Sequence, residues 1–147
     1  MHSPANSPAH CDDLKNRVLP FYTQALTVNT ATRPTAVLEA LLADDFQSIN
    51  SQEVKNKAVL CKQLEFFWTL IPNLTWEPQD VLVSGDKVVV RSIAAGSPKG
   101  PFMGLELDGS KSFRIDTIDI HHVVDGKIVR VHHLEDWATA IRQLSKK

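Results

Sequence analysis

The chain of 147 residues contains 43% hydrophobic and 22% charged residues, which is typical of a soluble globular protein and long enough for one substantial core. Its formal net charge of −1 argues against a broad basic surface for nucleic acid, and no apolar run is long enough to span a membrane. Two cysteines, Cys11 and Cys61, do not make a disulfide framework, so we expect a cytoplasmic protein.

Residues 1–11 form a predicted N-terminal tail. The segment MHSPANSPAHC lacks the apolar stretch of a signal peptide and the arginine-rich amphipathic pattern of a transit peptide. We therefore expect a flexible tail over residues 1–11 and a single domain over residues 12–147.

The first half of the domain has helical periodicity. Apolar residues recur at intervals of three and four positions over residues 12–26, 35–44 and 56–70, which predicts three helices. Pro20 should kink or divide the first helix, and Pro72 should end the third. A short extended piece is expected over residues 46–50.

The pattern changes to that of strands after Pro72. Extended segments are predicted over residues 74–77, 79–84, 87–95 and 105–107. The loop GSPKGPFMG over residues 96–104 could be a lid over a pocket or a plain connection. A short helix over residues 136–144 closes the chain.

A long hairpin is predicted over residues 112–137, and it carries four of the six histidines. Asp125-Gly126 favours the positive φ angles of a two-residue turn. In a regular hairpin with this turn, Asp119 lies opposite His132 and His121 lies opposite Arg130. Asp136 shares the face of these residues.

Three helices followed by antiparallel strands indicate an α+β protein. A sheet of about five or six such strands must twist strongly. Helices on one of its faces would make a half-open cone, an αβ roll with a pocket between the layers.

Several phrases of the chain resemble the SnoaL-like polyketide cyclase family, whose members share the cone of ketosteroid isomerase and of nuclear transport factors. They are LLADDFQSIN, PNLTWEPQDVLVSGDKVVVR and DGKIVRVHHLEDW, and the resemblance extends from Leu14 to Leu144. It implies the cone fold, but the fold serves isomerases, cyclases, dehydratases, hydrolases and binding modules alike.

The resemblance also implies roles for single residues. Asp136 matches the aspartate that acts as general acid and base in the cyclases. The accompanying histidine is His121 by hairpin alternation, or His122 by ungapped spacing, and one bulge would change the answer. Tyr22 matches a pocket tyrosine on the first helix. His132 replaces a family tryptophan, which makes the pocket more polar.

Asn50 falls where ketosteroid isomerase has its catalytic aspartate. An amide cannot serve as that base, so the resemblance does not imply a ketosteroid isomerase of the usual type. Asn50 and Tyr22 are instead expected to orient a substrate.

The polar residues of the hairpin suit proton transfer next to a carbonyl group. Such a reaction needs a base with a raised pKa and a hydrogen-bond donor for the enolate oxygen. Asp136 or Asp119 could be the base, with His132, His121 and Asn50 as donors. Alternatively, Asp119 and His132 are only a stabilising cross-strand pair, and Asp136 is only the N-cap of the last helix.

The histidine pairs also suggest a metal, since histidines and a carboxylate on facing strands can build an open site. Each pair splits across both faces of the sheet, so we expect neither a metal site nor a cofactor. Trp68, Phe102 and Met103 are predicted to line the substrate pocket, with core packing as the alternative for Trp68.

The other face of the hairpin is too apolar to remain in water, so we expect a homodimer through this outer sheet face. Its apolar residues are Ile118, Ile120, Val124, Val129 and Val131. The leading hypothesis is a cofactor-independent enzyme for cyclisation or isomerisation of a small apolar carbonyl compound. The alternative is a non-catalytic module that binds a hydrophobic ligand or dimerises.

Overall fold

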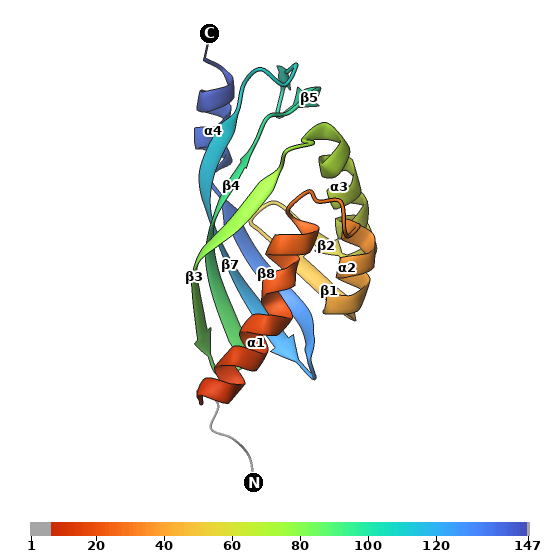
Figure 1. Ribbon diagram of the computed structural model, residues 1–147, viewed down its shortest axis with the longest axis vertical. Coiled ribbons are helices and arrows are strands. Elements are labelled where there is room, and N and C mark those ends of the chain that lie inside the picture. The colour runs from red at the N-terminus through yellow and green to blue at the C-terminus, as the bar shows by residue number, and fades with distance from the viewer. Residues whose placement is uncertain (1–6, 147) are drawn as a thin grey trace.

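Three helices cover the concave face of a strongly curved sheet, and a fourth lies at its far end (Figure 1). The computed structural model describes residues 7–146. The helical elements are α1 (Pro8–Pro20), the π-helix η1 (Phe21–Ala25), α2 (Pro34–Leu41), α3 (Lys57–Leu70) and α4 (Trp137–Leu144). The strands are β1 (Leu42–Ile49), β2 (Val54–Asn56), β3 (Thr75–Ser84), β4 (Lys87–Gly96), β5 (Pro101–Phe102), β6 (Leu105–Glu106), β7 (Phe113–Val124) and β8 (Lys127–Glu135).

The main sheet has six strands in the order β2-β1-β8-β7-β4-β3, and β5 pairs with β6 in a separate small hairpin. The predicted α+β cone is confirmed. The sheet is mixed rather than purely antiparallel, because β1 runs parallel to its neighbour β8. This pairing brings the first strand of the chain beside the last, and β8 on its other side pairs with β7.

Several predicted elements differ from the structure. Ser7 caps the first helix by accepting a hydrogen bond from His10 N, so α1 begins at Pro8, inside the predicted tail; residues 1–6 of that tail lie outside the described residues. Residues 42–44 belong to β1 instead of the second helix. Strand β3 is continuous through Pro78, which an edge strand tolerates. The short strands β2 and β5 were not predicted.

Pro20 does not divide the first helical segment, which continues as η1. Leu26 N donates to Phe21 O at 3.0 Å, five residues back, which widens the helix after the proline. The segment turns Phe21 and Tyr22 inward, where they are 5% and 0% exposed. The π-helix thus delivers a tyrosine hydroxyl to the centre of the cone.

The hydrophobic core fills the space between the helices and the concave face of the sheet. On the convex face, Leu82, Ile118, Ile120, Val124 and Leu134 are each at least 40% exposed. In the described part of the chain, no helix combines the length and apolarity that a membrane crossing needs.

Candidate functional site

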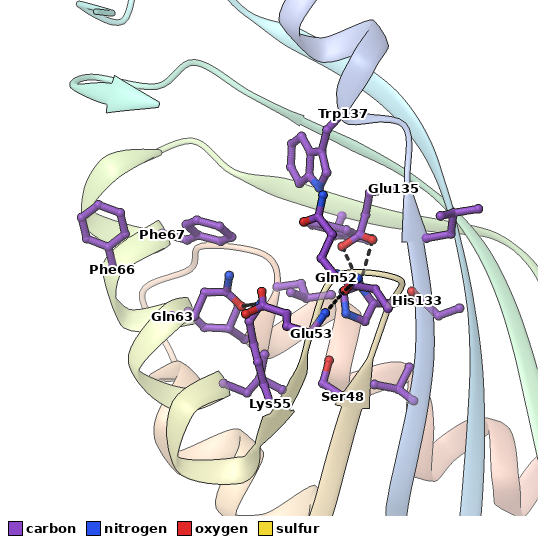
Figure 2. A pocket seen from close by; sticks show the side chains of 18 of the residues that line it. Ser48, Gln52, Glu53, Lys55, Gln63, Phe66, Phe67, His133, Glu135 and Trp137 are labelled. Carbon is purple, nitrogen blue, oxygen red and sulfur yellow. Dashed lines mark hydrogen bonds and ion pairs between the residues drawn. The ribbon is translucent and has the colours of Figure 1, made fainter. Parts of the chain in front are cut away.

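A cavity of about 660 Å³ opens between helix α3, the β1–β2 turn and the inner face of β7 and β8 (Figure 2). Its outer part is aromatic, with Phe66, Phe67, Phe102 and Trp137 among the lining residues. Its inner part is polar and includes Asp119, His133 and Glu135. The cavity thus combines an apolar entrance with titratable groups, as small-molecule sites commonly do.

Asp119 on β7 is the deepest carboxyl group of the cavity and is 4% exposed. Burial raises its pKa to about 7, because water no longer stabilises the charged form. The hydrogen bond that Tyr22 Oη donates to Asp119 Oδ2, at 2.7 Å, partly offsets this shift. Asp119 can therefore exchange a proton near neutral pH.

Tyr22 also connects Asp119 to a histidine behind it. Tyr22 Oη lies 2.6 Å from His121 Nε2, and His121 is fully buried. Burial lowers the pKa of His121 to about 3, so its ring is neutral at pH 7. A tyrosine hydroxyl has one proton. When Tyr22 donates it to ionised Asp119, His121 Nε2–H must donate to Tyr22 Oη.

With the ring proton on Nε2, His121 Nδ1 carries no proton and can only accept a hydrogen bond. Within residues 7–146, that atom has no hydrogen-bond partner. An unpaired buried acceptor costs free energy, which the bond to Tyr22 must offset. His121 thereby fixes the direction in which the Tyr22 proton points, toward the carboxylate.

His133 and Glu135 form an ion pair on the inner face of β8. His133 Nδ1 lies 2.8 Å from Glu135 Oε2, and both side chains are 15% exposed (Figure 2). Burial lowers the pKa of His133, but the hydrogen bond and charge of Glu135 and the charge of Asp119 outweigh it, so the pKa is raised overall. The imidazolium is therefore favoured beside Asp119.

The predicted hairpin register is correct only near its turn. Val124 pairs with Lys127 and Val123 with Ile128, but His122 then pairs with Arg130, which leaves Val129 without a partner. This β-bulge moves the rest of β8 by one residue. Asp119 therefore lies opposite His133, not His132, and His121 lies opposite Val131, not Arg130.

The bulge also exchanges the faces of β8. His132 is exposed, and Glu135 occupies the inward place predicted for Asp136. Asp136 is exposed and caps α4, accepting from Thr139 N at 3.2 Å and Thr139 Oγ1 at 2.6 Å. Hydrogen bonds from Thr139 lower the pKa of Asp136. Val131 faces the core instead of the predicted outer face.

Strand β7 keeps the predicted alternation, which places His121 inside and His122 outside. His122 Nε2 lies 2.7 Å from Asp86 Oδ2, away from the cavity. Of the two histidines that the resemblance left open, His121 is the inward one.

The other predicted substrate contacts divide into two groups. Asn50, Phe102 and Met103 line the cavity. Trp68 does not; it is buried and donates through Nε1 to Ala25 O at 2.9 Å, which is core packing. Tyr22 lies behind Asp119.

Sequence reasoning missed His133, Glu135 and Lys55 as cavity residues. The two residues of β8 had been assigned to the opposite face, and only knowledge of the bulge could have moved them. Lys55 belongs to the short strand β2, which had no recognised pattern. No group of three or more potential ligand side chains in residues 7–146 is arranged to hold a metal ion.

Comparison with known proteins shows the same architecture in several solved structures. A protein of Jannaschia sp. CCS1 described as a SnoaL-like polyketide cyclase is 19% identical with a TM-score of 0.82, over 100% of this chain and 98% of the other. TsrD of Streptomyces laurentii is 22% identical with a TM-score of 0.74, over 95% and 97%. An LEH-like epoxide hydrolase of M. tuberculosis is 15% identical with a TM-score of 0.68, over 90% of each chain.

At these identities the solved structures show a common fold and no more. No curated protein matches the sequence. The model of the SnoaL-like polyketide cyclase family, however, matches residues 16–144, nearly the whole described domain. The chain therefore belongs to the SnoaL-like polyketide cyclase family.

Proposed function

We propose that the protein is an enzyme that transfers a proton at the carbon next to a carbonyl group of a small apolar compound, in a cyclisation, isomerisation or related reaction. The observation that carries the proposal is the buried carboxyl group of Asp119, whose pKa is raised to about 7 on the polar floor of an aromatic cavity. Such a carboxylate is a stronger base than one in water and is still partly ionised near neutral pH.

The neighbouring residues suit the rest of this chemistry. Ionised Asp119 takes the proton from the substrate carbon, and charge then develops on the carbonyl oxygen. His133, whose charged form Glu135 favours, donates a hydrogen bond or proton to that oxygen. Tyr22 and His121 hold the carboxylate from behind. The proposed base, donor and supporting groups are thus all supplied by amino-acid side chains of this protein.

A non-catalytic binding module is the second candidate, and one observation favours it. Asp136, the residue that matches the family's acid and base, is exposed and caps α4. If this were the only competent carboxylate of the fold, the cavity could bind a ligand but not turn it over. Asp119 and His133 are the residues that distinguish the two functions.

Exchange of substrate protons with solvent tests the proposal without knowledge of the product. The protein is mixed with apolar cyclic ketones such as 2-tetralone in D₂O, and loss of the α-proton signal is followed by ¹H NMR. The wild type should accelerate the exchange, and Asp119→Asn should lower the accelerated rate at least about 100-fold, a usual contribution of a general base.

Asp136→Asn is the matched control, because asparagine also caps helices well. It should keep the exchange rate within about two-fold of the wild type, since Asp136 lies outside the cavity. Equal rates for Asp119→Asn and the wild type would contradict the assignment of Asp119. Ketone binding without accelerated exchange in the wild type would favour the binding module.

A further inference from the structure

A partly buried ammonium group lies on the cavity wall formed by β2 and α3. The side chain of Lys55 is 11% exposed, and its Nζ lies 2.9 Å from Glu53 Oε1. It also donates to Gln63 Oε1 at 3.0 Å, and all three residues line the cavity (Figure 2). A buried ammonium is costly unless a counter-charge stays beside it. A ligand that fills this part of the cavity must preserve that charge balance.

Glu53 is a counter-ion that can be exchanged. Its side chain is 52% exposed, so it can return to water at little cost. The turn that carries it is held by other bonds: Asn50 Oδ1 accepts from Gln52 N and Glu53 N, each at 2.9 Å. Asn50 N also donates to Glu53 O at 3.1 Å. The carboxylate can therefore leave Lys55 while the turn backbone stays in place.

Further hydrogen-bonding capacity lies on the same side of the cavity. Gln63 uses its amide oxygen for Lys55, so its NH₂ group remains able to donate. Ser48 is 4% exposed and lines the cavity with its hydroxyl group. The charge of Lys55 also acts on His133 and lowers its pKa in part, so this wall is electrostatically coupled to the proposed catalytic residues. A negative ligand group at Lys55 would thus hold the ligand beside Asp119 and His133.

We propose that the cavity recognises a carboxylate, which replaces Glu53 on Lys55, and that the substrate is an apolar carboxylic acid with an enolisable carbonyl group. The apolar body would lie among the aromatic residues of the entrance, including Phe67 and Trp137. The carbonyl part of this inference rests on the proposed function, whereas the carboxylate part rests on Lys55 alone. Binding of a molecule that cannot react therefore tests it separately.

The probes are 2-naphthylacetate and 2-naphthylacetamide, which share shape and aromatic surface and differ in charge. Binding is measured by isothermal titration calorimetry at pH 7.5 and low salt. The wild type should bind the acid about ten-fold or more tightly than the amide, the effect of a charge-assisted hydrogen bond. Lys55→Met should reduce this ratio to about one while leaving amide binding nearly unchanged.

Lys57→Met is the matched control. Lys57 is 12% exposed and pairs with Glu39 at 3.0 Å, so it resembles Lys55, but it does not line the cavity. This variant should keep the wild-type preference for the acid. Glu53→Gln should raise the affinity for the acid several-fold, because it removes the charge that competes for Lys55.

Equal binding of acid and amide by the wild type, or no binding of the acid, would overturn the inference. So would loss of the preference in Lys57→Met to the same degree as in Lys55→Met. None of these results depends on proton exchange. A preference for the acid together with an unaffected exchange rate in Asp119→Asn would leave the carboxylate site standing and remove the proposed chemistry.

Discussion

Asp119 lies directly across the β7–β8 pair from His133, although a regular hairpin would place it opposite His132. Directly opposed residues on one face of an antiparallel pair have Cβ atoms about 5 Å apart. The bulge at Val129 therefore brings a carboxyl group with a raised pKa beside an imidazole whose pKa Glu135 raises. The proposed base and donor owe their juxtaposition to one unpaired residue.

Substitution of the two adjacent histidines tests this arrangement. His133→Ala should lower the proton-exchange rate on an apolar ketone about 100-fold, because the enolate oxygen loses its donor. His132→Ala should change the rate by less than about two-fold, because His132 is exposed on the other face. The same NMR assay measures both variants. The reverse result, a defect in His132→Ala alone, would mean that the regular register operates in solution.

The cone itself could be predicted from sequence because its signals are local. The three-and-four spacing of apolar residues indicates the helices, and Asp125-Gly126 indicates the turn of the long hairpin. Strand β7 alternates between buried and exposed residues from Phe113 to Val124, so the inward positions of Asp119 and His121 follow from the pattern. The fold and one strand of the site were therefore predictable.

The other strand of the site was not predictable. Val129 lies in the run IVRV, which has no glycine to mark a bulge, so the pattern of the sequence fits both registers. A one-residue shift then exchanges the side chains of β8 after the bulge between the faces. This shift accounts for the wrong placement of His132 and Asp136 and for the omission of His133 and Glu135.

Contacts between distant segments were also beyond sequence reasoning. Tyr22 and Asp119 are separated by 97 positions, and their hydrogen bond depends on the π-helix after Pro20. The resemblance placed Tyr22 in the pocket, but no local pattern connects its hydroxyl group to Asp119 and His121.

The hydrogen bond from Tyr22 should control the pH dependence of the reaction. Asp119 must be ionised to act as base, so kcat/KM should rise with pH through about 7, the pKa of Asp119. The donor Tyr22 lowers that pKa. Tyr22→Phe should therefore move the acid limb to higher pH by about one unit. The measurement is kcat/KM for proton exchange from pH 5 to pH 9.

His122→Gln is the control for this pH profile. His122 lies on the outer face and pairs with Asp86, so its loss should leave the acid limb in place. An acid limb that moves in His122→Gln but not in Tyr22→Phe would contradict the assignment of this titration to Asp119.

The raised pKa of Asp119 should also appear in protein stability. The unfolded chain has an aspartate pKa of about 4. Between pH 4 and pH 7 the folded protein keeps a proton that the unfolded chain has lost, so this group stabilises the fold below pH 4 and loses that contribution as the pH rises through 7. Asp119→Asn has no carboxyl group to ionise at this position, so the variant does not lose stability in this way as the pH rises. The stability of the variant relative to wild type should therefore improve by on the order of 2–4 kcal/mol between pH 4 and pH 8.

Urea unfolding of both proteins at several pH values measures this difference in the free energy of unfolding. A hydrogen bond that the variant lacks at every pH shifts the difference by a constant and does not change its dependence on pH. Asp136→Asn should show the opposite sign. The pKa of Asp136 is lowered by Thr139, so its stabilisation is present above the unfolded pKa and is lost as the pH falls. A pH-independent difference for Asp119→Asn would show that its folded pKa is close to that of the unfolded chain.

The exposed apolar face of the sheet predicts self-association. Ile118 and Leu134 pair with each other on β7 and β8 and are 47% and 69% exposed. An apolar surface of this kind favours a second copy of the chain. Light scattering during size-exclusion chromatography should give the mass of a dimer for the wild type, and the double variant Ile118→Glu/Leu134→Glu should give the mass of a monomer.

Val59→Glu is the control. It changes an apolar residue of α3 that is 45% exposed, away from the sheet, and should leave the dimer intact. A monomeric wild type, or a double variant that stays dimeric, would show that the convex face is not the contact.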